Sequence, residues 1–210
     1  ECVPDFMPDI LRLFHFILQQ ADNEGFLDTG IEILQHTLFI SEGSISKEAW
    51  DLVPLIHKTV MGGAVDYFAK FEPVLDNFVS SGLEFFVTND DVIQVFYEIC
   101  EKMILGGTVA EPDDLMSAPM LCECIFHYCK AHSDRFDQHA PAFITMLLQG
   151  LQRDDMSHDK VRLWMICAMC DAFWYNADLT MRVIIDSGAY PFFFDGMFSF
   201  LRRFTTNWEE

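Results

Sequence analysis

Apolar residues recur three or four positions apart along nearly the whole chain, and this spacing limits the folds open to it. In the segment 90–105, for example, Phe96, Ile99 and Met103 share one face of a helix, while charged and amide side chains occupy the other. No run of alternating apolar and polar residues predicts a β-strand. The chain is therefore predicted to be all-α.

Short turn motifs divide the helical pattern into segments. Gly62-Gly63 and Gly106-Gly107 are the clearest, because glycine readily adopts the backbone conformation that ends a helix. Thr88, with Asp91 three residues later, is predicted to cap the helix that follows it. The predicted helices span residues 5–20, 26–40, 46–61, 65–80, 89–105, 115–131, 135–152, 158–176, 179–187 and 191–206.

Successive helices repeat as pairs, which start near Ser46, Thr88 and Asp134. The intervals of 42 and 46 residues match the roughly 40–47 residues of a HEAT-type repeat. Such a pair buries its apolar face only against neighbouring pairs, so several pairs form one elongated domain. We therefore expect an α-α superhelix (solenoid) of HEAT-like helix pairs, with residues 1–210 forming a single domain of about four to five pairs.

The segment 134–176 resembles the HEAT pattern most closely. Pro141 and several leucines lie on its first helix, Asp155 lies in the turn, and Val161-Arg162 opens the second helix. Spaced alanines follow, and such small residues let two helices approach closely.

Three prolines, Pro54, Pro73 and Pro141, are predicted to lie inside helices. Apolar spacing continues past each of them, so they do not argue against a helix. We expect each to kink its helix, because proline lacks the backbone N–H and clashes with the preceding turn.

The chain is strongly acidic, with 33 acidic and 13 basic residues and a net charge of −20. This balance argues against nucleic acid as a partner, because binding to phosphates depends on Lys and Arg. It also disfavours an anionic membrane surface. Most of the charge lies in residues 1–130. Two interpretations remain open: the charge maintains solubility, or it forms a surface that attracts basic partners.

No membrane insertion is expected. The most apolar stretch, residues 163–175, is interrupted by Asp171 and is shorter than the roughly 20 residues that span a bilayer. No signal peptide is recognisable. The chain begins with Glu1 rather than Met, so we expect it to be part of a longer protein.

Acidic residues on the second helix of each pair are the candidates for a binding surface, because that helix usually lines the concave face of a solenoid. Like charges crowded on one face repel one another, and a basic partner would relieve that repulsion. Two further candidates lie on a first helix. The eight residues are Asp28, Glu32, Asp66, Glu72, Asp76 and Glu123 on second helices, with Glu98 and Glu101 on a first helix.

Cysteine and histidine patterns favour core packing over chemistry. Cys167 and Cys170 form a C-x-x-C motif, but they lie in an apolar helical run, where thiols pack as small hydrophobes. The cluster Cys122, Cys124 and Cys129 is interpreted in the same way. The odd total of seven cysteines predicts reduced thiols and an intracellular compartment. No ligand spacing, nucleophile elbow or phosphate loop is recognisable, so no catalytic residue, metal ligand or cofactor is predicted.

The chain is rich in phenylalanine, with 21 residues, and the run at 190–194 is the densest aromatic stretch. Two interpretations stay open for this run. It forms the core of the last helix pair, or it forms a patch that binds apolar side chains of a partner.

One set of residues is more specific than the general repeat pattern. In order and spacing it resembles the carboxy-terminal half of nuclear transport receptors of the importin-beta superfamily, and most closely the importin seven and importin eight branch. The similarity is strong over roughly 31–105 and looser over 115–180. The residues that carry it are Trp50-Asp51-Leu52-Val53-Pro54-Leu55, Asp66-Tyr67-Phe68, Pro73-Val74-Leu75-Asp76-Asn77-Phe78-Val79, Val95-Phe96-Tyr97-Glu98-Ile99-Cys100 and Trp174-Tyr175-Asn176.

The resemblance implies a receptor that carries protein cargo through nuclear pores and is controlled by the GTPase Ran. The partners it implies are basic cargo such as ribosomal proteins and histones, with Ran and nucleoporins as partners of the full-length protein. It implies a location in both cytoplasm and nucleus. No enzymatic activity is expected, because the sequence combines a repeat fold with no recognisable catalytic motif, and an α-helical enzyme is kept only as a third class. The family binds Ran mainly through amino-terminal repeats, and this branch carries a long acidic loop that is missing from the sequence. A HEAT scaffold outside nuclear transport, such as a regulatory subunit, is the alternative.

Overall fold

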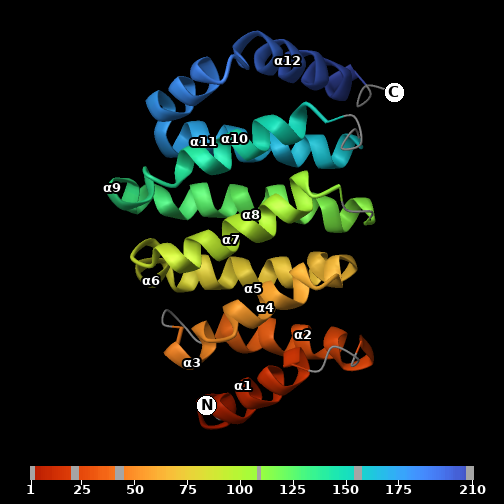
Figure 1. Ribbon diagram of the computed structural model, residues 1–210, viewed down its shortest axis with the longest axis vertical. Coiled ribbons are helices and arrows are strands. Elements are labelled where there is room, and N and C mark those ends of the chain that lie inside the picture. The colour runs from red at the N-terminus through yellow and green to blue at the C-terminus, as the bar shows by residue number, and fades with distance from the viewer. Residues whose placement is uncertain (1–2, 20–23, 41–44, 108–109, 154–157, 207–210) are drawn as a thin grey trace.

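The computed structural model describes residues 3–19, 24–40, 45–107, 110–153 and 158–206, and within these ranges it contains helices and no strand. The chain runs from one end of an elongated stack to the other (Figure 1). In chain order the elements are α1 (Val3–Gln19), α2 (Glu24–Ile40), α3 (Lys47–Trp50), α4 (Val53–Met61), η1 (Ala64–Tyr67), α5 (Phe68–Ser81), α6 (Leu83–Val87), α7 (Asp90–Leu105), α8 (Pro112–Cys129), η2 (Lys130–His132), α9 (Ser133–Phe136), α10 (Ala140–Leu151), α11 (Asp159–Asp186) and α12 (Tyr190–Thr206).

The long helices form two layers. Helices α1, α4, α7 and α10 pack in that order and make up one layer, here called layer A. Helices α2, α5, α8 and α11 pack in order as the second layer, here called layer B. Helix α12 then packs against α11 at the end of the stack (Figure 1). This arrangement confirms the predicted all-α solenoid of HEAT-like helix pairs.

A continuous apolar core runs along the stack between the two layers. Each long helix contributes one buried face, as its 3.6-residue periodicity predicts. The largest fully buried side chains are phenylalanines, which are spread over several elements from α5 to α10. They are Phe68, Phe71, Phe78, Phe86, Phe96, Phe126, Phe136 and Phe143.

The expectation of three kinking prolines is wrong for two of them. Pro54 lies in the first turn of α4 and Pro141 in the first turn of α10, where the missing N–H has no helical partner in any case. The predicted helices 46–61 and 135–152 are accordingly divided, so that short α3 and α9 precede α4 and α10. Pro73 does lie inside α5. The predicted turn residue Asp155 lies outside the described residues.

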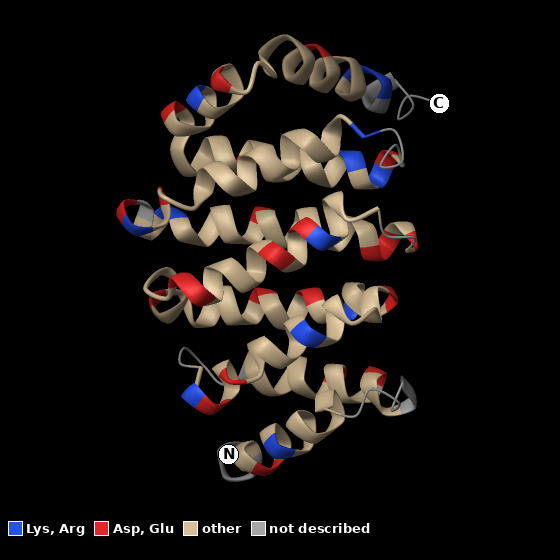
Figure 2. Ribbon diagram, in the orientation of Figure 1, with Lys and Arg blue, Asp and Glu red and all other residues tan. Residues whose placement is uncertain are grey.

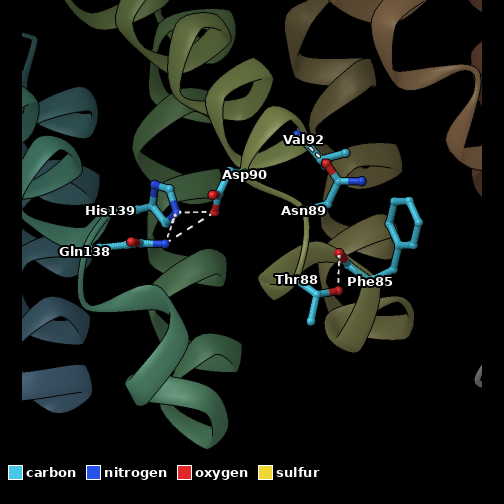
Figure 3. Close-up of polar contacts among 7 residues, drawn as sticks. All are labelled: Phe85, Thr88, Asn89, Asp90, Val92, Gln138 and His139. Carbon is cyan, nitrogen blue, oxygen red and sulfur yellow. Dashed lines mark hydrogen bonds and ion pairs between the residues drawn. The ribbon is translucent and has the colours of Figure 1, made fainter.

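The predicted cap at Thr88 is also wrong, as Figure 3 shows. The Thr88 hydroxyl donates backwards to the carbonyls of Glu84 (2.6 Å) and Phe85 (3.2 Å), because Thr88 ends the short helix α6. Asn89 is the N-cap of α7 instead, and its side-chain oxygen accepts from the Val92 N–H at 3.4 Å. At the other end, Gly106 ends α7 as predicted, and Gly107 follows with a φ of 62°.

A polar contact joins the starts of two neighbouring helices in layer A. Asp90, at the start of α7, lies 2.9 Å from His139 Nε2 and accepts from the Gln138 side-chain amide at 3.3 Å (Figure 3). His139 is the N-cap residue of α10. The contact therefore links the amino-terminal ends of α7 and α10.

Helix α11 bends sharply at Asn176, whose backbone angles (φ −154°, ψ 95°) are not helical. The Asn176 side chain accepts from the Leu179 N–H at 3.1 Å, and so caps the helical segment that follows. Asp137 lies beside the bend and accepts from the Tyr175 hydroxyl at 2.6 Å and from the Asn176 amide at 3.2 Å. Sequence analysis predicted two helices, 158–176 and 179–187, and this bend is the break between them.

The cysteines in the described residues are free thiols. Cys122, Cys124 and Cys129 are buried in α8, and burial raises the pKa of all three thiols. Their predicted role as core residues is confirmed. The expectation is wrong for Cys170, which is exposed on α11, and Cys2 lies outside the described residues.

Candidate functional site: an acidic column on layer B

Three of the predicted acidic residues come together on layer B. Glu72 and Asp76 lie one helical turn apart on α5, and Glu123 lies on the adjacent helix α8. Burial, followed by the nearby charges of Asp76 and Glu123, raises the pKa of Glu72 to about 7. The three carboxyl groups are thus close enough to repel one another.

Asp171 on α11 extends this group to a third helix. Burial raises the pKa of Glu123, and the charge of Asp171 adds to that effect. Asp171 also lies 3.5 Å from Nδ1 of His127. We call Glu72, Asp76, Glu123 and Asp171 the acidic column, because they follow one another across α5, α8 and α11.

Sequence analysis did not include Asp171 among the candidates. One signal could have identified it, since it is the single charged residue that interrupts the apolar run 163–175. A lone carboxylate in such a run lies at the edge of a buried helical face or has a specific partner.

A cysteine thiol completes the surroundings of Asp76. The Cys124 sulfur donates to an oxygen of Asp76 at 2.7 Å, from α8 to α5. Burial, followed by the charge of Asp76, raises the pKa of this thiol, so Cys124 stays protonated and acts as a donor. Asp76 is thereby held in place while its remaining oxygen lone pairs are available to another donor.

The other second-helix candidates lie outside the acidic column. Asp28 on α2 pairs with Lys70 on α5, so a basic side chain already lies beside its charge. Glu32 is exposed one turn further along α2, and Asp66 is exposed in η1. Asp66 lies near Asp114, whose pKa is raised mainly by burial.

Glu98 and Glu101 lie on α7, which belongs to layer A and not to layer B. Glu98 lies 2.8 Å from His57 Nε2 and accepts from Gln94 at 3.0 Å. Glu101 accepts from the Tyr97 hydroxyl at 2.7 Å, and the pKa of that hydroxyl rises to about 12, chiefly through burial. Figure 2 shows acidic stretches on α7 as well as on α5 and α8. The structure therefore places Glu98 and Glu101 on the opposite layer from the candidates of α2, α5 and α8, and Asp66 in the short helix η1.

The geometry of the acidic column suits a cationic ligand. Carboxylates that are partly buried and close together are less stable when all are charged, and a neighbouring cation removes that penalty. Within the described ranges, no group of three or more His, Cys, Asp or Glu side chains is arranged to hold a metal ion.

Replacing Glu72 with glutamine is expected to stabilise the protein at high pH. In the folded protein the pKa of Glu72 is about 7, above its ordinary value of 4.5. Ionisation of Glu72 therefore does not lower the free energy of unfolding below about pH 4.5, and lowers it by the full amount above about pH 7. At about 1.4 kcal/mol per unit of pKa, Glu72→Gln should add about 1–3 kcal/mol at pH 8 and little at pH 4.5. Urea unfolding at both pH values measures the difference.

The exposed Glu32 on α2 provides the matched control. Glu32→Gln makes the same chemical change on layer B and should alter the free energy of unfolding by no more than about 0.5 kcal/mol at either pH. An equal gain from Glu72→Gln at pH 4.5 and pH 8 would show that Glu72 is not strained by its charge.

Three comparisons with known proteins bear on this chain. It is 25% identical to human importin-8 over 174 residues, which is 83% of the chain. The chain is thus similar in sequence to an importin. The importin beta-like SAD2 homolog of Arabidopsis thaliana is 25% identical over 179 residues, and a probable importin-7 homolog of Dictyostelium discoideum is 22% identical over 177. The resemblance to the importin-beta superfamily found in the sequence is thereby confirmed.

The chain corresponds to a small part of these importins. It spans 16% of the length of human importin-8 and 17% of that of the Arabidopsis homolog. No protein-family profile matches the chain, and no solved structure does. None of the described helices combines the length and apolar character needed to cross a membrane.

Proposed function

We propose that the chain is a segment of a nuclear transport receptor and that its acidic column binds basic segments of protein cargo. The observation that carries this proposal is the gathering of Glu72, Asp76 and Glu123 on adjacent helices of layer B, in a relative of the importins. Ribosomal proteins and histones have the Lys-rich and Arg-rich segments that such a surface would attract. In the whole receptor, Ran and nucleoporins would be further partners, and the receptor would move between cytoplasm and nucleus.

Binding would proceed through charge neutralisation. The net charge of −20 attracts a basic segment from a distance, and the acidic column then forms short ion pairs with it. A bound Lys or Arg lowers the pKa of Glu72 from about 7, so a proton leaves on binding near neutral pH. Affinity for a basic segment should therefore rise between pH 6 and pH 8.

The test is binding of a fluorescent Lys-rich and Arg-rich peptide to the chain, at low salt and at about 0.15 M salt. The triple variant Glu72→Gln, Asp76→Asn, Glu123→Gln should bind at least about tenfold more weakly, which corresponds to about 1.4 kcal/mol. Its dependence on pH between 6 and 8 should disappear, because the titrating carboxyl is gone.

The double variant Glu98→Gln, Glu101→Gln is the matched control on layer A. It removes two acidic residues that already have partners, and it should leave most of the affinity. Equal losses in the triple and the double variant would indicate attraction by net charge alone. Absence of binding at low salt would contradict the proposal and would favour a HEAT scaffold without a basic cargo.

A further inference from the structure

An apolar groove lies at the opposite end of the stack from α1, where α12 packs against α11 and Leu151 of α10 lies beside them. The groove has a volume of about 70 Å³, which is several times the volume of roughly 10–15 Å³ that one water molecule needs. The groove therefore has room for a side chain. Residues that line it include Leu151 of α10, Ile166 of α11, and Phe193, Met197 and Phe200 of α12.

Gly196 leaves one wall of the groove open. It lies on α12 and lines the groove, and a Cβ atom built at this position would meet nothing within 4 Å. Glycine in a helix interior costs about 1 kcal/mol relative to alanine, so a larger residue there would favour the helix. The space beside position 196 is therefore open, and a side chain larger than a methyl group is needed to fill it.

Arg162 is the charged residue of the groove. It lies one helical turn from Ile166 on α11, and its Nε atom is buried without a hydrogen-bond acceptor among the described residues. The guanidinium is always charged, and a buried donor without an acceptor is unfavourable. A carboxylate satisfies such a group best, because it accepts two parallel hydrogen bonds.

The charge around the groove differs from that of the rest of the chain. Lys and Arg gather where the end of α12 approaches the start of α11 (Figure 2). Residues in this region include Arg202 and Arg203, of which Arg203 lies over the ring of Phe200. Lys160 is also nearby in sequence to Arg162, but it pairs with Asp113 on α8 at 3.6 Å. An acidic ligand is therefore favoured here although the chain as a whole is acidic.

We propose that this groove binds an acidic peptide segment of a partner protein, in which an aromatic or large aliphatic residue lies next to Asp or Glu. The apolar side chain fills the hollow over Gly196, and the carboxylate pairs with Arg162. This surface is separate from the acidic column and takes a partner of the opposite charge.

The test uses three labelled peptides and fluorescence anisotropy at about 0.15 M salt, where repulsion from distant acidic residues is screened. The first peptide has a phenylalanine between two glutamates, the second has glutamines in place of the glutamates, and the third has alanine in place of phenylalanine. We expect the first to bind the chain at least about tenfold more tightly than either of the others.

Variants of the chain then assign the contacts. Arg162→Met should abolish the preference for glutamate over glutamine, while Arg182→Met, which removes an exposed arginine further along α11, should retain it. Gly196→Leu should fill the groove and lower the affinity for the first peptide at least about tenfold, whereas Gly196→Ala should leave that affinity unchanged. Because both Gly196 variants favour the helix, weaker binding in one alone cannot be attributed to unfolding.

Several results would overturn the proposal. Equal binding of the three peptides would show that neither the charge nor the ring is recognised. If Arg162→Met and Arg182→Met change the preference for glutamate over glutamine equally, Arg162 does not bind the carboxylate. If sedimentation shows that the chain forms a dimer that Gly196→Leu dissociates, the groove is occupied by a second copy instead.

Discussion

Replacing Phe136 with alanine is expected to lower the free energy of unfolding by about 3–5 kcal/mol. Phe136 belongs to the four-residue helix α9, and its ring is fully buried. It lies 5.6 Å from the ring of Tyr175 and 5.8 Å from that of Phe143, measured between ring centroids. Phe86 and Phe126 also contact it, so rings from α6, α8, α10 and α11 meet at this one side chain.

The cost of Phe136→Ala has two parts. The ring loses the benefit of burial, and the rigid helices around it leave a cavity that cannot close fully. Urea unfolding followed by circular dichroism measures the loss. Phe39→Ala on α2 is the matched control, because this ring is 74% exposed and its removal should change stability by no more than about 0.5 kcal/mol. A loss below about 1 kcal/mol for Phe136→Ala would contradict its place at the junction of two repeats.

Replacing Asp137 with alanine should cost about 2–4 kcal/mol and should loosen the bend in α11. The Tyr175 hydroxyl and the Asn176 amide would each lose the carboxylate of Asp137 as an acceptor. Tyr175 is only 3% exposed, so water replaces the lost contact poorly. Asn176 would also be less firmly held as the cap of the segment after the bend.

Hydrogen exchange locates this effect and unfolding measures its size. The Leu179 amide, which donates to the Asn176 side chain, should exchange faster in Asp137→Ala than in the parent chain. Asp137→Asn retains a carbonyl acceptor, so its free energy of unfolding should fall by less, about 1 kcal/mol. Asp134→Ala, an exposed change on α9, should be nearly neutral. If Asp134→Ala and Asp137→Ala behave alike, the contacts at the bend contribute nothing specific.

Periodicity predicted the long helices because each of them buries one face over several turns. It did not predict α3, α6 and α9, since four or five residues are too few for a helical period to be visible. The errors at Thr88, Pro54 and Pro141 share this cause. Each of these residues borders or follows a short helix. Because the short helix was not predicted, the predicted end of the neighbouring long helix is wrong.

The candidate site was predicted in part for a similar reason. Glu72 and Asp76 share a face of one helix, which spacing alone specifies, and Glu123 lies on the second helix of the next pair. The partners of Glu98 and Lys70 depend on how neighbouring helices are aligned, and a single helix carries no signal for that alignment. The burial that raises the pKa of Glu72 depends on the same packing.

The buried thiols of α8 can be used to measure how often the centre of the solenoid opens. Alkylating reagents attack the thiolate, and burial both shields Cys122, Cys124 and Cys129 and raises their pKa. These sulfurs lie in the middle of the stack, so a reagent reaches them only when the central helices separate. The rate of their modification, with Cys170 as the exposed reference, therefore records how often the centre of the solenoid opens.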